Sequence, residues 1–281
     1  MSLPSGRKPA PLQSSAACFR AKAAFFGKLG SAKQEQVVAA NIDTVFLCMS
    51  LNQNFNLRRL ERYLSIAYDS GAEPVVVLTK ADLCQDPEDK LAQVRTAAPG
   101  AEILTVSSLT GDTDAVLPYI LPGRTVAFLG SSGVGKSTLI NKLMGTSALA
   151  TGAVGTADKG RHTTTHRQLL TLPNGAFLID TPGMRELGMW DSDGGIDTAF
   201  QDLLELTRAC RFSNCTHTAE PGCAVQKALA DGTLDAGRWE SFRKLKLENA
   251  SAAERSRYLD AKREKFKSIS KTNKTNRKSG S

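Results

Sequence analysis

The arrangement of apolar and polar residues predicts strands that alternate with helices from Gln36 onward. Short apolar runs, typical of strands buried on both faces, cover residues 37–40, 44–48, 74–78, 102–106, 125–129 and 176–179. Helical periodicity occurs between these runs, over residues 56–70, 87–98 and 139–143. The alternation predicts an α/β fold with a mostly parallel sheet and helices on both of its faces.

The segment 56–70 shows the helical pattern most clearly. Its apolar side chains recur at helical spacing and fall on one face: Leu57, Leu60, Leu64 and Ala67. We expect the charged side chains between them to point into solvent: Arg58, Arg59, Glu61 and Arg62. Gly71 is expected to end the helix.

The pattern divides the chain into four parts: 1–35, 36–192, 193–268 and 269–281. The first part has no strand periodicity, and we expect a poorly ordered lead-in with one short helix near residues 21–29. The second part is the α/β domain. The third is expected to be a smaller, mainly helical domain, with helices over 224–231 and from residue 238 to 266. The last part has the composition of a disordered basic tail.

A glycine-rich stretch lies between the apolar run 125–129 and the helical segment that follows it. It matches G-x-x-x-x-G-K-S between a strand and a helix, which distinguishes a phosphate-binding loop from a flexible Gly/Ser turn. Lys136 would reach the terminal phosphates of a nucleotide, and the Ser137 hydroxyl would hold Mg²⁺. The expected nucleotide-binding residues are Gly130, Ser131, Ser132, Gly133, Val134, Gly135, Lys136, Ser137 and Thr138.

Two further polar groups follow apolar strands, where ligands bind in parallel sheets. Their members are Thr79, Lys80, Ala81 and Asp82, and then Ser107 and Ser108. The Asp82 carboxylate can accept both N1–H and N2–H₂ of guanine, donors that adenine cannot supply. The T-K-x-D pattern alone matches by chance more often than not. Its place at a strand end, beside the phosphate loop, is what favours a guanine site, with Ser107 and Ser108 closing over the base edge.

The run 176–179 leads into Asp180-Thr-Pro-Gly183. Asp180 is expected to hold Mg²⁺ through a water molecule, and the Gly183 N–H is expected to meet the γ-phosphate. The alternative is that Asp180 only forms a turn.

A polar loop, Gly-Arg-His-Thr-Thr-Thr-His over residues 160–166, precedes that strand. One of its threonines, with Thr163 and Thr164 as the candidates, would complete the magnesium shell when GTP is bound. Ras-like enzymes place a water-orienting Gln where this chain has Met184, so slow intrinsic turnover is expected. His162 is the candidate for orienting the attacking water. The alternative is a histidine that only packs within the loop.

Three cysteines and a histidine lie within fourteen residues in the helical part: Cys210, Cys215, His217 and Cys223. Thiolates and imidazole are suited to tetrahedral zinc, and four protein ligands leave no open position, which is typical of a structural site. The alternative is three ordinary buried cysteines, against which the polar residues between them argue. Cys48, in an apolar run, is expected to be a core residue.

Composition and charge add a partner class. The net charge is +8, and residues 251–281 hold ten Lys or Arg against three acidic residues. A basic tail suggests a polyanion such as RNA, with a merely solvated tail as the alternative. No apolar run reaches the roughly 20 residues of a membrane span, and the start lacks a secretory signal. We therefore expect a cytoplasmic protein without structural disulfides, acting as a monomer.

The order of the motifs is unusual for a G domain. The base-reading residues 79–82 come before the phosphate loop, whereas an ordinary G domain has them after it; circular permutation preserves such a site in space. A permuted G domain followed by Cys-x4-Cys-x-His-x5-Cys resembles the ribosome small-subunit-dependent GTPase A family, as do residues 36–43, 160–165 and 220–225. The resemblance covers roughly residues 36–259.

The resemblance implies GTP hydrolysis stimulated by the small ribosomal subunit during its late maturation, contact with its rRNA, and a structural zinc ion. Two features depart from the family. The residues before Gln36 show no alternating strands, so the N-terminal OB-fold barrel of the family is expected to be absent or truncated. Thr79 replaces an Asn whose amide braces the phosphate loop. Two alternatives remain: an RNA-binding zinc module with a regulatory nucleotide site and negligible turnover, and an ATP-dependent P-loop enzyme.

Overall fold

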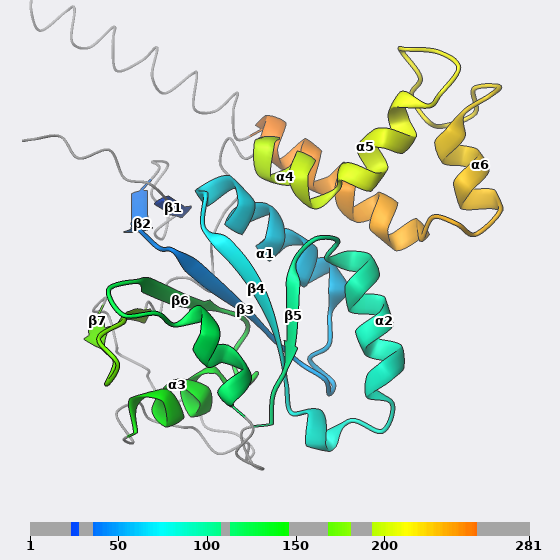
Figure 1. Cartoon of the computed structure of the whole chain (residues 1–281). Coiled ribbons are helices and arrows are strands. Elements are labelled where there is room, and N and C mark those ends of the chain that lie inside the picture. Colours follow the sequence, from blue (N-terminus) through cyan, green and yellow to red (C-terminus); the bar gives the residue numbers. More distant parts are fainter. Residues whose placement is uncertain (1–23, 28–35, 108–112, 146–167, 181–192, 252–281) are drawn as a thin grey trace, which may run out of the picture.

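A six-stranded sheet forms the centre of the molecule, in a computed structural model that describes residues 24–27, 36–107, 113–145, 168–180 and 193–251 (Figure 1). Its strands are β3 (Thr44–Ser50), β4 (Glu73–Thr79), β5 (Glu102–Thr105), β6 (Thr125–Leu129), β7 (Gln168–Thr171) and β8 (Phe177–Asp180). They lie in the order β5-β4-β3-β6-β8-β7, and all neighbours are parallel except β7 and β8. The predicted mostly parallel sheet is confirmed, and β7 is a strand that the apolar pattern missed.

Both faces of the central strands are buried. In β3, Phe46 and Cys48 belong to one apolar core and Val45 and Leu47 to the other. The core that holds Leu47 is covered by the helices α1 (Leu57–Ser70) and α2 (Pro87–Ala97). The opposite core is covered by α3 (Lys136–Met144) and the 3-10 helix η2 (Asp114–Tyr119). Helices on both faces leave the carboxyl edge of the sheet as the open place for a ligand.

Helix α1 has the predicted apolar face, but its polar face is not fully exposed to solvent as predicted. Leu60, Leu64 and Ala67 are buried as expected. Glu61, expected to point into solvent, has 0% exposure, so that prediction is wrong. A long-range contact explains the difference, because the guanidinium of Arg238 lies 3.0 Å from Glu61 Oε1. A helical pattern identifies a polar face, but it does not reveal which later segment covers that face.

The strand β1 (Ala24–Gly27) pairs antiparallel with β2 (Gln36–Ala40) in a separate two-stranded sheet. The prediction of a helix near residues 21–29 is therefore wrong for residues 24–27, which form a strand. The sequence there contains Phe25 and Phe26, and aromatic residues favour strands. The pairing partner lies several residues along the chain, outside the window in which helical periodicity is judged.

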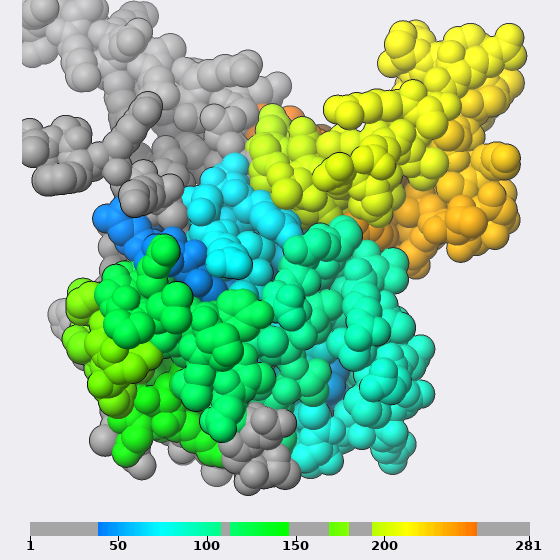
Figure 2. Space-filling model, in the orientation of Figure 1, coloured from blue at the N-terminus to red at the C-terminus, as the bar shows by residue number. Residues whose placement is uncertain are grey.

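After the sheet, the described residues form four helices: α4 (Asp193–Ala199), α5 (Gln201–Arg208), α6 (Ala224–Ala230) and a C-terminal helix over residues 236–251. Figures 1 and 2 show α5 and α6 projecting away from the α/β body. The predicted helix at 224–231 is confirmed, and the C-terminal one as far as residue 251; the rest lies outside the described residues. In the C-terminal helix Trp239, Phe242 and Leu245 are buried, whereas Leu247 is exposed. In the described segments, no helix combines the length and apolar character that crossing a membrane requires.

Helix α4 packs so closely on α1 that Gly195 has no room for a side chain. A Cβ atom there would lie 2.0 Å from the carbonyl oxygen of Ser65 and 2.6 Å from Asp69 Cβ. We expect Gly195→Ala to lower the free energy of unfolding by about 1–3 kcal/mol, because a clash with backbone cannot be relieved by a rotamer change. Urea unfolding followed by circular dichroism would measure it.

Gly194 provides the matched control for that prediction. A Cβ on Gly194 would meet nothing within 4 Å, so Gly194→Ala should be neutral or should stabilise the helix by up to about 1 kcal/mol. Equal effects of the two substitutions would show that the close approach of α4 to α1 is unimportant.

Candidate functional site

The phosphate loop connects β6 to α3 at the carboxyl edge of the sheet. Gly130 has φ +153°, and a Cβ there would lie 2.5 Å from the carbonyl oxygen of Cys48 in β3, so only glycine allows the loop to pass this close. Lys136 Nζ donates to the carbonyl oxygens of Gly130 at 2.6 Å and Ser131 at 2.7 Å. The loop therefore curls around the lysine ammonium group. Burial raises the pKa of Cys48 to about 12, so this thiol is a neutral core group, as predicted.

The base-reading residues reach the phosphate loop from the end of β4. The Thr79 hydroxyl donates to the carbonyl oxygen of Val134, and Lys80 Nζ donates to that of Gly133 at 2.7 Å. Thr79 thus holds the loop through its hydroxyl, which replaces the brace expected to be lost with the family's Asn. Two consecutive residues of β4 and its following turn fix the position of the phosphate loop.

Asp82 and Ser107 also meet, although they are far apart in the chain. Asp82 lies in the 3-10 helix η1 (Ala81–Leu83), Ser107 lies just beyond β5, and the Ser107 hydroxyl donates to Asp82 Oδ1 at 2.6 Å. The hydroxyl orients a carboxylate that is itself exposed to solvent. An oriented, accessible carboxylate is the arrangement that a base with two adjacent N–H donors requires.

The structure describes some of the remaining predicted site residues and not others. Ser132 lies in the loop, Ser137 and Thr138 lie in the first turn of α3, and Asp180 ends β8 beside β6. These positions bring all of them to the same sheet edge. The other candidates lie outside the described residues: Ser108, His162, Thr163, Thr164 and Gly183.

One residue at the loop was not found by sequence analysis. Arg59, expected to point into solvent, donates from Nη1 to the Ser131 hydroxyl at 3.1 Å. Its position on the polar face of α1 did not indicate this contact. The contact depends on how the start of α1 packs over the phosphate loop.

The four predicted zinc ligands come together in the projecting helical part. One ligand atom from each of Cys210, Cys215, His217 and Cys223 lies within 4.8 Å of the others. His217 Nδ1 is 3.5 Å from Cys210 Sγ and 3.6 Å from Cys223 Sγ. Three thiols and one ring nitrogen converging on a point fit a tetrahedral metal site, whereas separate core cysteines would not converge.

The thiols of this cluster differ in acidity. Desolvation raises the pKa of Cys215 to about 11, with neighbouring thiols contributing. Desolvation also acts on Cys210, but hydrogen bonds from the backbone of Val225 and Ala224 outweigh it and lower the pKa of that thiol. The N–H groups at the start of α6 therefore favour one thiolate, the form that binds a metal.

The loop that carries His217 is held in shape by Glu220. Its carboxylate accepts hydrogen bonds from the Thr216 N–H at 2.7 Å, the Thr218 N–H at 3.0 Å and the Thr216 hydroxyl. These bonds hold the pKa of Glu220 well below its usual range. Gln226 Nε2 donates to the His217 carbonyl oxygen at 2.6 Å, and the Trp239 ring meets the imidazole edge-on at 5.4 Å. The ligand loop is thus fixed by polar and aromatic contacts around it.

Comparison with known proteins connects this geometry to a family. The family model described as RsgA GTPase matches residues 26–190, which is more than half of the chain. The chain belongs to the RsgA GTPase family. The resemblance inferred from motif order is confirmed, and the matched range contains every predicted nucleotide-binding residue.

Individual RsgA-family proteins support the assignment. A protein of Lactiplantibacillus plantarum named small ribosomal subunit biogenesis GTPase RsgA 2 is 53% identical over 227 residues, 80% of this chain and 64% of that protein. The chain therefore spans just under two thirds of the length of that relative. The crystal structure of YjeQ from Thermotoga maritima superposes with a TM-score of 0.57 at 26% identity, over 80% of this chain and 74% of that one.

A second solved structure bears on the fold. YloQ, described as a circularly permuted GTPase, has a TM-score of 0.55 and 22% identity, over 85% of this chain and 83% of that one. The shared fold confirms the predicted circularly permuted G domain.

Proposed function

We propose that this RsgA-family chain binds GTP with Mg²⁺ and hydrolyses it to GDP and phosphate during late maturation of the small ribosomal subunit. The observation that carries the proposal is the convergence of four groups at one sheet edge. Asp82 is oriented by Ser107, while Thr79 and Lys80 hold the phosphate loop. A guanine-reading carboxylate and a phosphate loop fixed to the same turn give one nucleotide a base contact and a phosphate contact together.

Each residue has a role in this proposal. Lys136 binds the terminal phosphates, and backbone N–H groups of residues 130–138 surround the others. Ser137 and Asp180 would hold Mg²⁺, which neutralises charge developing on the phosphate oxygens. One of Thr163 and Thr164 would complete the magnesium shell, Gly183 would contact the γ-phosphate, and His162 would orient the attacking water. These last assignments rest on the motifs alone.

We also propose that the cluster of Cys210, Cys215, His217 and Cys223 holds one structural Zn²⁺. Its donor set and convergence support that metal, and four protein ligands leave no position for substrate. Residues 193–268 would form this zinc-binding helical domain, attached to a G domain over 36–192.

The proposed partner is the small ribosomal subunit, contacted through its rRNA. Relatives are named for the biogenesis of that subunit, and residues 251–281, with ten basic and three acidic side chains, provide charge for an RNA partner. The proposal places the chain in the cytoplasm, where ribosomes mature, and treats it as a monomer.

Two substitutions should separate guanine reading from phosphate binding. Asp82→Asn is expected to weaken GTP binding about 100-fold or more, because an amide cannot accept both guanine donors. It should bind xanthosine triphosphate better than wild type does, since the amide can donate to the oxygen at C2 of xanthine. Lys136→Ala should weaken binding of both nucleotides. Fluorescent-nucleotide titration measures these affinities, with Asp89→Asn, an exposed carboxylate on α2, as control.

Phosphate release from GTP, with and without purified small ribosomal subunits, tests the reaction itself. We expect slow turnover that the subunits accelerate, and loss of that acceleration in Lys136→Ala. Guanine-specific binding without turnover under either condition would favour the RNA-binding module with a regulatory nucleotide site. Met184, in the place of a water-orienting glutamine, is the sequence feature that supports this alternative. Equal binding of ATP and GTP would contradict the guanine site.

A further inference from the structure

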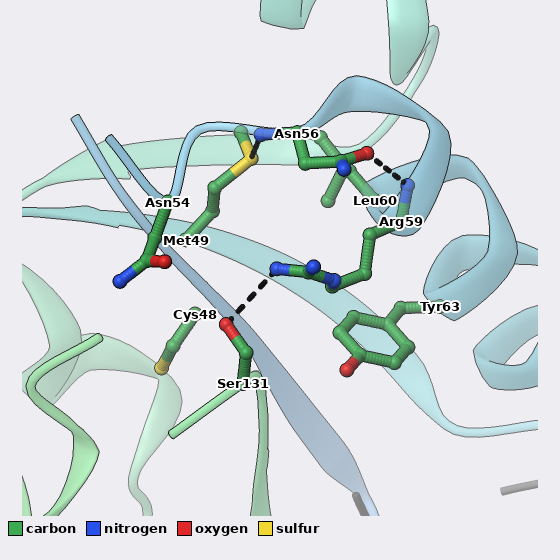
Figure 3. Close-up of a pocket in the computed structure, with 8 residues that line it drawn as sticks. All are labelled: Cys48, Met49, Asn54, Asn56, Arg59, Leu60, Tyr63 and Ser131. Carbon is green, nitrogen blue, oxygen red and sulfur yellow. Dashed lines mark hydrogen bonds between the residues drawn. The ribbon is translucent and has the colours of Figure 1, made fainter. Parts of the chain in front are cut away.

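A cation at the start of α1 faces the phosphate loop, and the nucleotide site described above does not use it. Figure 3 shows the Arg59 side chain extending from α1 across a small hollow toward Ser131, with Tyr63 and Asn54 also on its walls. The guanidinium donates from Nη1 to the Ser131 hydroxyl at 3.1 Å. The backbone at this point is fixed independently, because the Arg59 N–H is capped by Asn56 Oδ1 at 2.9 Å.

The neighbouring arginines of α1 form ion pairs, whereas Arg59 forms none with the residues that the structure describes. Arg58 pairs with Glu61 and Asp235, and Arg62 pairs with Glu248 at 2.7 Å. Within the described part of the chain, Arg59 has no ion pair, and its guanidinium has the neutral Ser131 hydroxyl as its hydrogen-bond partner. A phosphate oxyanion would add a charge–charge attraction that the neutral hydroxyl lacks, and it could accept two guanidinium N–H groups at once, so we expect it to displace this contact.

The anion that fits is a phosphate. The Ser131 hydroxyl accepts a hydrogen bond from Arg59. The Ser131 carbonyl oxygen accepts one from Lys136 Nζ at 2.7 Å. Two cations therefore converge on one residue of the phosphate loop. A planar guanidinium matches the two oxygens of a phosphate edge, and the long arginine side chain allows the short movement from Ser131 into the nucleotide site.

We propose that Arg59 binds the terminal phosphate of a nucleoside triphosphate, exchanging the Ser131 hydroxyl for γ-phosphate oxygens. The inference rests on the proposed nucleotide site and adds to it a residue that distinguishes triphosphate from diphosphate. With GDP bound, Arg59 stays on Ser131. With GTP bound, it contributes charge at the oxygens where negative charge develops during hydrolysis, a task that arginine performs in other phosphoryl-transfer sites.

The test compares two nucleotides on the full chain. Affinities for GDP and for the non-hydrolysable guanosine 5′-(β,γ-imido)triphosphate are measured by calorimetry for wild type, Arg59→Ala and Arg59→Lys. We expect Arg59→Ala to weaken the triphosphate about 10- to 100-fold, with the GDP affinity unchanged within about twofold. Arg59→Lys, which keeps the charge but loses the fork, should lie between. Arg95→Ala, an exposed arginine on α2, should match wild type.

Three results would overturn the inference. One is an equal loss of both nucleotides in Arg59→Ala, which would indicate a structural role at the loop. Another is no loss of either nucleotide, with the proposed GTP site left standing. A wild-type chain that binds neither nucleotide would overturn the inference and the proposed function together. Thermal unfolding of Arg59→Ala, expected to match wild type closely, excludes misfolding as the cause of any loss.

Discussion

Replacing Arg238 with methionine should lower the free energy of unfolding by about 3–5 kcal/mol, because it removes the buried one of the two arginines that pair with a buried carboxylate. Arg238 is 2% exposed and Glu61 is 0% exposed. All five N–H donors of the guanidinium are used. Nη1 donates to Glu61 and the Ala97 carbonyl oxygen, Nη2 to Asp202 and the Ala199 carbonyl oxygen, and Nε to Asp202.

The loss should be large because the site cannot rehydrate. The guanidinium also lies 4.7 Å over the Phe200 ring, which closes its other side. Without Arg238, the ion-pair partner left to Glu61 among the described residues is Arg58, which is itself partly exposed to solvent. One oxygen, Glu61 Oε2, has no hydrogen-bond partner in the described part of the chain even with Arg238 present. Removing the arginine therefore takes a hydrogen-bond donor from a buried carboxylate that already has one oxygen without a donor.

A double variant distinguishes an unpaired charge from lost packing. Glu61→Leu combined with Arg238→Met removes both charges, so it should be more stable than Arg238→Met alone. Arg243→Met, on the exposed face of the same helix, should change stability by less than about 0.5 kcal/mol. Chemical denaturation of wild type, Glu61→Leu, Arg238→Met and the double variant gives the coupling energy between the two residues. If the double variant loses the sum of the two single effects, the buried pair is not what stabilises this contact.

Sequence alone was sufficient for five of the six strands of the sheet and for the edge that carries the nucleotide motifs. Continuous apolar runs such as 74–78 identify doubly buried strands, and parallel strands bring their carboxyl ends together. Asp82 and Ser107 could therefore be expected to lie near each other before their hydrogen bond was known. The thiols and imidazole were found for a similar reason, since ligands close in sequence converge without knowledge of the fold.

Contacts between distant segments could not be predicted in this way. Glu61 and Arg59 looked like solvent-facing charges on a regular helix, yet one is covered by Arg238 and the other reaches Ser131. Both outcomes depend on how α1 packs against later segments, which a local pattern does not contain. Strand β1 was missed because its partner determines its conformation. In each case the deciding interaction spans elements that sequence periodicity treats separately.

These contacts give α1 a position between the two parts of the molecule. Arg59 touches the phosphate loop, while Glu61 and Arg62 are bonded to Arg238 and Glu248 of the C-terminal helix. The first two turns of one helix thus join the nucleotide edge to the part that carries the metal cluster. Any displacement of α1 would therefore act on both the phosphate loop and the C-terminal helix through these contacts.

Removing the proposed zinc ion should unfold the ligand loop and α6 while leaving the G domain folded. Structural zinc supplies about 10–16 kcal/mol of apparent binding free energy in small domains at neutral pH. The seven-residue helix α6 is too short to be stable by itself. The residues between the first two cysteines, 211–214, are exposed and bring little apolar surface. The metal would thus be a major stabilising interaction of the ligand loop, beside the burial of Val225 and Ala228 of α6.

Metal analysis and hydrogen exchange together would test whether zinc is bound and whether it keeps the ligand loop and α6 folded. We expect one zinc per chain in the wild type and in Cys84→Ser, a cysteine outside the cluster, and much less in Cys215→Ser. A chelator should speed amide exchange over residues 210–231, while the strands β3, β4 and β6 keep their protection. Leu47, Val76 and Ala127 of these strands are fully buried, and the strand pairing that protects their amides involves no residue of the cluster. Unchanged exchange after complete zinc removal would mean that Trp239 and the hydrogen bonds of Glu220 suffice to hold the loop, and that the metal is not structural.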